Sequence, residues 1–208
     1  MKYWTLEEFD KFVVTVKDKP ISFNAFMVLF WTGLRLSEMI ALTLSDFDPE
    51  KKTLSVNKSI FRAPGGEDIV TPPKTEKSVR VIALPDFLVE QLKGYISMLY
   101  GLQPDDRIFP VTKHYMEKEM KRGINLSGVK AIRVHDLRHS HASLMASMGA
   151  DPKLVADRLG HENIQTTLNT YSHLYPNQAR SLADSLHQLK LSKESEKDEE
   201  DKKDNKEE

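Results

Sequence analysis

The sequence predicts a mainly helical α+β fold with one small antiparallel sheet. Apolar residues recur at helical spacing through most of the chain, and the period changes to that of strands between residues 53 and 84. A chain of 208 residues that is 39% hydrophobic is long enough for one sizeable core, or for a domain with a tail. We therefore expect one folded domain.

The N-terminal part is expected to form three helices. Thr5 opens a capping box, and the helix that follows should run to about Lys17. A second helix, rich in phenylalanine, should end at Gly33, and Ser37 can cap a third. Arg35 is then expected in a tight turn between two helices.

The predicted sheet lies in the middle of the chain. Thr53–Ile60 and Ser78–Leu84 are rich in β-branched residues and flank the turn residues Pro64–Gly66 and Pro72–Pro73. We expect an antiparallel sheet whose loop carries Lys74.

Helical spacing returns after the sheet. A helix is expected after Pro85, and the strongest pattern follows from His135 to Met148. Further helices are expected over residues 115–121, from Asp151–Pro152 to Leu159, from Ile164 to Tyr171, and at Leu182, Leu186 and Leu189.

Charge is distributed unevenly along the chain. Residues 192–208 hold five Lys and nine Asp or Glu and no apolar residue, so we expect a disordered tail there. The remainder carries 25 Lys and Arg against 22 Asp and Glu and is mildly basic, which permits a nucleic-acid partner without requiring one.

The absence of cysteine excludes a disulfide scaffold and a thiolate zinc site. No apolar stretch is typical of a membrane span or a signal peptide, and we expect a cytoplasmic protein.

Residues suited to phosphate chemistry cluster late in the chain. His135 and Arg138 are three apart and so share one face of a helix. His161 follows a helix stop at Gly160, where unpaired backbone N–H groups favour negative charge. Tyr171 follows ten residues later, and a phenol is a nucleophile once a base takes its proton. These groups fit metal-free attack on a phosphodiester.

Three runs of sequence resemble the catalytic domain of the tyrosine recombinases, or phage integrases, particularly those of Gram-positive phages and conjugative elements. The resemblance covers nearly all of residues 1–180, and the runs are TGLRLSEMIALTLSDF, KTEKSVRVIAL and HDLRHSHASLMASMGADPKLVADRLGHENIQTTLNTYSHL. It implies the fold of that domain, with a small antiparallel three-stranded sheet flanked by helices. It also implies six catalytic residues: Arg35, Lys74, His135, Arg138, His161 and the nucleophile Tyr171.

The reaction implied by the resemblance is strand cleavage through a 3′-phosphotyrosyl link, without metal, ATP or another cofactor. Arg35 and Arg138 would hold the phosphate oxygens and His161 would donate a further hydrogen bond. His135 is the candidate base and Lys74 the candidate acid. The implied partners are double-stranded DNA attachment sites and three further copies in a homotetramer on DNA, the isolated domain being a monomer. A directionality factor is a partner that the resemblance allows.

The resemblance also divides the chain. We expect the catalytic domain at residues 1–180, a C-terminal helix at 181–191 that is exchanged between protomers, and the charged tail at 192–208. Members of the family usually carry a core-binding domain before the catalytic one, whereas this sequence opens directly on the latter.

Other interpretations stay open on the residues alone. Residues 151–173 could form a helix-turn-helix that binds DNA without cutting it, although the second helix offers no Arg or Lys. A relaxing topoisomerase or an inactive regulatory integrase fragment is a further alternative. By periodicity alone, Tyr171 would be a core tyrosine with a bonded hydroxyl. For His139 and His141 we expect helix packing or phosphate contact rather than metal binding.

Overall fold

The computed structural model describes residues 2–72, 78–172, 183 and 186–190. The chain divides into two units, Met1–Leu174 and Tyr175–Glu208. The first unit contains the helices α1 (Leu6–Val13), α2 (Pro20–Thr32), α3 (Leu36–Ala41), α4 (Asp86–Ser97), α5 (Lys113–Ser127), α6 (Asp136–Ser147), α7 (Pro152–Leu159) and α8 (Ile164–Tyr171).

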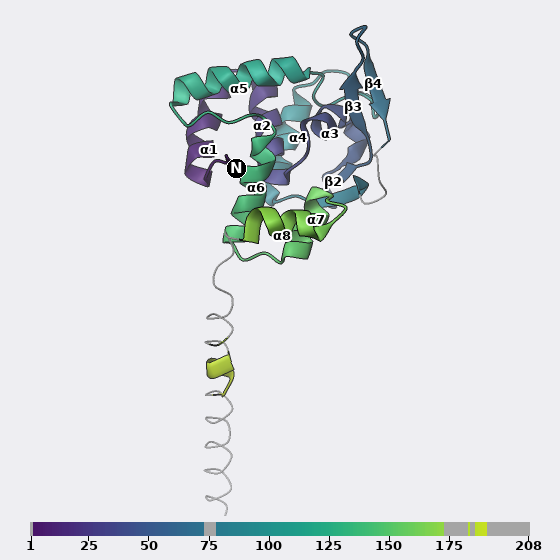
Figure 1. The fold of residues 1–208 in the computed structure, drawn as a ribbon. Coiled ribbons are helices and arrows are strands. Elements are labelled where there is room, and N and C mark those ends of the chain that lie inside the picture. Colours follow the sequence, from purple (N-terminus) through teal and green to yellow (C-terminus); the bar gives the residue numbers. More distant parts are fainter. Residues whose placement is uncertain (1, 73–77, 173–182, 184–185, 191–208) are drawn as a thin grey trace, which may run out of the picture. The chain divides into compact units, whose positions relative to one another are not determined.

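The core of the first unit forms where α1, α2, α5 and α6 pack together (Figure 1). Aromatic side chains fill it, and the rings of Phe9 and Phe30 stack with their centroids 3.8 Å apart. The helix α2 is buried on nearly all sides, which explains its run of apolar residues without a polar face. It therefore gives a fixed base for the turn that follows it.

The strands form two small antiparallel sheets. The three-stranded sheet has the order β1–β2–β5, from Phe47–Asp48, Thr53–Val56 and Arg80–Ala83, and pairs Val56 with Arg80. A separate hairpin joins β3 (Ser59–Arg62) to β4 (Asp68–Thr71). The α+β class, the mainly helical content and the three-stranded antiparallel sheet are thus confirmed.

Two local predictions differ from the structure. The expected strand Thr53–Ile60 is two strands, because the side chains of Asn57 and Lys58 turn to the buried carboxylate of Asp46. The expected cap at Ser37 is wrong: α3 begins at Leu36, and its N-cap is Arg35, two residues before Ser37. The Arg35 backbone N–H donates to Glu38 Oε2 at 2.9 Å, which satisfies one of the unpaired donors at the start of the helix.

The capping box at Thr5 is confirmed, since the Thr5 N–H donates to Glu8 Oε2 at 2.8 Å and the Glu8 N–H donates back to Thr5 Oγ1.

In the second unit, residues 186–190 are helical, with Leu186 and Leu189 exposed. Leu182 and the tail at 192–208 lie outside the described residues. Within the described part of the chain, no helix is both long enough and apolar enough to cross a membrane.

Candidate active site

Arg138 lies at the centre of the candidate site. Its side chain is 4% exposed, and it donates to the carbonyl oxygen of Gly33 at 2.9 Å and to that of Leu159 at 2.6 Å. Burial and the positive charge of Arg35 lower its pKa to about 9, so the guanidinium stays charged at neutral pH. A guanidinium has more N–H groups than these two carbonyls engage, so Arg138 can also donate to a bound anion.

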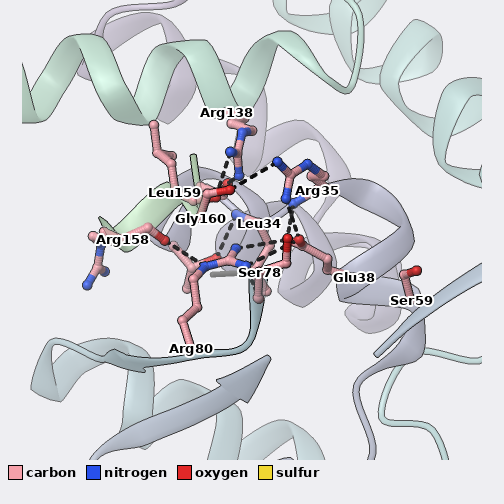
Figure 2. A network of polar contacts seen from close by, with 12 residues as sticks. Leu34, Arg35, Glu38, Ser59, Ser78, Arg80, Arg138, Arg158, Leu159 and Gly160 are labelled. Atoms are coloured by element: carbon pink, nitrogen blue, oxygen red, sulfur yellow. Dashed lines mark hydrogen bonds and ion pairs between the residues drawn. The ribbon is translucent and has the colours of Figure 1, made fainter. Parts of the chain in front are cut away.

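Arg35 approaches the same point from α3. Its Nη2 donates to the carbonyl of Gly160 at 3.3 Å, next to the Leu159 carbonyl that accepts from Arg138. Its Nη1 donates to Glu38 Oε1 at 2.7 Å, and its side chain is 37% exposed. Two guanidinium groups, one buried and one reaching solvent, therefore converge on consecutive carbonyls at the end of α7 (Figure 2).

A buried ion pair holds Arg35 in place. Arg80, the first residue of β5, donates to both carboxylate oxygens of Glu38, at 2.9 and 3.2 Å, and its Nε donates to the carbonyl of Arg158 at 2.8 Å. The Arg80 and Glu38 side chains are only 7% and 6% exposed. Burial alone would raise the pKa of Glu38, but the hydrogen bonds and charges of Arg80 and Arg35 keep it below its usual value. Glu38 is therefore ionised and links the two arginines (Figure 2).

Two glycines permit this close packing. Gly33 adopts φ +69°, and a Cβ there would lie 2.6 Å from His141 Cδ2 and 2.7 Å from Leu159 Cδ2. Gly160 adopts φ +67°, and a Cβ there would lie 2.9 Å from Arg80 Nη1. Both the left-handed backbone and the contact distances thus favour glycine at the points where the arginines meet the chain.

His161 follows Gly160 directly. Its Nδ1 is 2.8 Å from the buried hydroxyl of Thr167. Burial and the charges of Arg138 and Arg35 lower its pKa to about 4, so the ring is neutral at pH 7. A neutral imidazole keeps one N–H group, which can serve as a hydrogen-bond donor but not as a cation.

His135 occupies the N-cap position of α6 and is exposed. It lines an open groove of about 1040 Å³ together with Arg35. Partial burial and the charge of Arg138 lower its pKa, which favours the neutral ring. The charged residues that line the groove are mostly basic: Arg35, Arg62, Lys113, Lys121 and Arg133, against Glu117.

Tyr171 ends α8 and is only 2% exposed. Burial raises its pKa to about 12, although the charge of Arg138 opposes this, so the phenol is protonated at neutral pH. Its hydroxyl lies 2.6 Å from Nδ1 of His139. A core tyrosine would also be buried with a bonded hydroxyl, so this geometry alone does not separate a nucleophile from a packing residue.

The structure therefore brings five of the six predicted residues to the packed ends of α2, α6, α7 and α8. Lys74, the sixth, lies outside the described residues. His141 is a packing residue rather than a phosphate ligand, because it is buried and its Nε2 accepts from Arg158 Nε at 3.0 Å. No group of three or more His, Asp or Glu side chains that could hold a metal ion occurs within the described ranges.

Sequence reasoning missed Glu38, Arg80 and the contact of His139. Glu38 and Arg80 lie inside the runs that carried the resemblance, three residues after Arg35 and six after Lys74. The spacing of Arg35 and Glu38 is a local signal that could have been used, since residues three apart are neighbours at a helix start. Nothing local indicates Arg80, which meets Glu38 across the fold.

Solved structures with this fold define its class. The Tn1549 transposon integrase in complex with circular intermediate DNA aligns with a TM-score of 0.76 at 24% identity, covering 89% of this chain and 67% of that one. The catalytic domain of bacteriophage HP1 integrase aligns with a TM-score of 0.60 at 17% identity, covering 88% and 94%. The fold is that of a tyrosine recombinase catalytic domain.

The sequence comparison gives the family. The profile of the Phage integrase family matches residues 3–178, and the chain belongs to this family. It is 34% identical over 203 residues to the ICEBs1 integrase of Bacillus subtilis (strain 168), a match that covers 91% of this chain and 55% of the relative. It is 28% identical over 193 residues to the transposase from transposon Tn916 of Enterococcus faecalis, covering 81% and 47%. The chain spans about half the length of the curated relatives it matches.

Proposed function

We propose that the protein is a site-specific DNA recombinase that cuts and rejoins strands through a 3′-phosphotyrosyl intermediate. The observation that carries the proposal is the convergence of Arg35 and Arg138 on the Leu159–Gly160 carbonyls, beside His161 and within the electrostatic reach of Tyr171. Membership of the family supports it.

In the proposed cleavage step, the site stabilises the negative charge that builds on the phosphate. The Tyr171 oxygen attacks the scissile phosphorus, and the bond to the 5′-oxygen breaks. Arg35 and Arg138 donate to the non-bridging oxygens, on which charge builds in the pentacoordinate transition state, and His161 adds a neutral donor. Arg138 is fixed by two carbonyls, so little reorganisation is needed when the phosphate arrives. The free 5′-hydroxyl of a partner strand then reverses the step.

Two protons must move in this reaction. The leaving 5′-oxygen takes one, and Lys74, six residues before Arg80 in the sequence, is the proposed donor. Tyr171 loses the other, and His135 is the acceptor that the resemblance implies. The exchange replaces one phosphodiester by another, so the mechanism uses neither ATP nor a cofactor.

The proposed DNA partner would bind along the groove beside Arg35 and His135, whose lining is mostly basic.

Strand exchange joins two duplexes and uses four active sites, so we propose a homotetramer on DNA, formed in the bacterial cytoplasm. The segment 181–191 is the proposed contact between protomers. Removing it should weaken cooperative assembly more than cleavage at a single site, and an equal loss of both would contradict this role.

A nicked suicide duplex tests the proposal. Its core sequence is selected for binding from a random pool, and the duplex is incubated in EDTA with wild-type protein and with Tyr171→Phe. A covalent protein–DNA band is expected on a denaturing gel for the wild type alone. DNA binding with no band would instead support a DNA-binding module or an inactive fragment. Relaxation of supercoiled plasmid without joining of two sites would support the topoisomerase alternative.

A further inference from the structure

A second histidine of α6 contacts the tyrosine hydroxyl. His139 lies one helical turn after His135, and its Nδ1 is 2.6 Å from the Oη of Tyr171. The rings of His135 and His139 are perpendicular, with centroids 5.4 Å apart. The residue in hydrogen-bonding contact with the proposed nucleophile is therefore His139, one turn away from the histidine that the sequence motif implies.

His139 also borders a route to solvent. It lines a surface pocket of about 450 Å³ together with Lys2, Ala131, Ile132, Arg133 and Asp136. The imidazole is half-buried, contacts the Tyr171 hydroxyl through Nδ1 and also lines this pocket. A proton accepted at Nδ1 makes an imidazolium, which can release its Nε2 proton to water in the pocket.

The surroundings of His139 prepare it to accept a proton. Burial and the charges of His135, Arg138 and Arg133 lower its pKa, whereas the carboxylate of Asp136 raises it. The neutral ring therefore predominates at pH 7, and a neutral ring has a lone pair on one nitrogen. The titratable or charged groups facing His139 are Tyr171 from α8, His135, Asp136 and Arg138 from α6, Arg133 from the segment before it, and Lys2 across the pocket.

We propose that His139 is the general base that takes the proton of Tyr171 during strand cleavage, a role that rests on the proposed recombinase function. As the Oη–phosphorus bond forms, the Oη proton passes to Nδ1 of His139. The phosphorus–O5′ bond breaks, and the 5′-oxygen takes a separate proton from the acid of the site. His135, which lines the groove beside Arg35, then acts on the phosphate rather than on the tyrosine.

Two substitutions separate proton transfer from positioning. In His139→Asn, the amide oxygen can occupy the place of Nδ1 and accept the Tyr171 hydrogen bond, but it takes no proton near neutral pH. His139→Ala removes both functions. If His139 is the base, both variants should cleave at least about 100-fold more slowly than wild type in single-turnover assays on the selected suicide duplex. If it only positions the tyrosine, His139→Asn should restore most of the rate.

The dependence of the cleavage rate on pH gives the second readout. The cleavage rate of wild type should fall at acidic pH, because His139 becomes protonated. This acidic limb of the pH–rate profile should vanish in His139→Asn but persist in His135→Asn. Loss of the limb in His135→Asn alone would overturn the proposal and return the base role to His135.

The outcomes separate the two proposals. If wild type forms no covalent adduct, the recombinase function fails and the base role fails with it. If wild type forms the adduct and His139→Asn matches its rate and pH profile, only the base role fails. Circular dichroism and binding of the same duplex confirm that each variant is folded.

Discussion

Replacing Arg80 with methionine removes the buried cation that fixes Glu38. Arg80 makes four hydrogen bonds, two to the Glu38 carboxylate and two to the carbonyls of Arg158 and Ser78. Breaking a buried ion pair costs about 3–5 kcal/mol, because the remaining charge is left without its partner. Arg35 still pairs with Glu38, so we expect the lower end, about 3 kcal/mol.

Urea unfolding of Arg80→Met measures this cost, with Lys52→Met as the matched control. Lys52 pairs with Asp86 at the surface, where the side chains are 53% and 78% exposed, so its removal should change the free energy of unfolding very little. In a double-mutant cycle, Glu38→Gln and Arg80→Met should couple by about 2 kcal/mol. A loss in Arg80→Met no greater than that in Lys52→Met would refute the reasoning.

Three further predictions follow from the site. Gly33→Ala should lower the free energy of unfolding, measured in urea, by about 1–3 kcal/mol more than Gly128→Ala does. Both glycines have φ near +70°, but only a Cβ added at Gly33 would meet other atoms. Equal losses would contradict the packing argument. Burial lowers the pKa of His141 to about 3, so below pH ~6.5 the unfolded chain takes up a proton that the folded chain does not. As the pH falls below this value, the free energy of unfolding should therefore decrease by up to about 1.4 kcal/mol per pH unit. This contribution should be missing in His141→Gln. Arg138→Lys should reduce single-turnover cleavage by about 10²–10³-fold with little change in DNA affinity, and a loss confined to affinity would argue against transition-state contact.

Local signals explain why most helices could be predicted. The capping box at Thr5, the stop at Gly33, the Asp151–Pro152 start and the stop at Gly160 each act within a few residues, and the helices begin or end there. The division of the strand after Val56 could not be predicted, because it depends on Asp46, eleven and twelve positions from the two side chains that it binds.

The site residues, too, fall into those that local motifs predict and those that only the folded structure reveals. The motifs identified Arg35, His135, Arg138, His161 and Tyr171, and the structure brings them to neighbouring helix ends. The pair of Glu38 and Arg80 spans 42 positions, so no spacing rule indicates it. Whether His135 or His139 meets the tyrosine depends on where α8 packs against α6, which the sequence pattern of α6 alone does not determine.

The most direct test of the account is to locate the bond between protein and DNA. The adduct from the suicide duplex is digested with protease and nuclease, and the modified peptide is sequenced by mass spectrometry. We predict a nucleotide joined through its 3′-phosphate to Tyr171. A link to another residue, or one through a 5′-phosphate, would contradict the proposed mechanism.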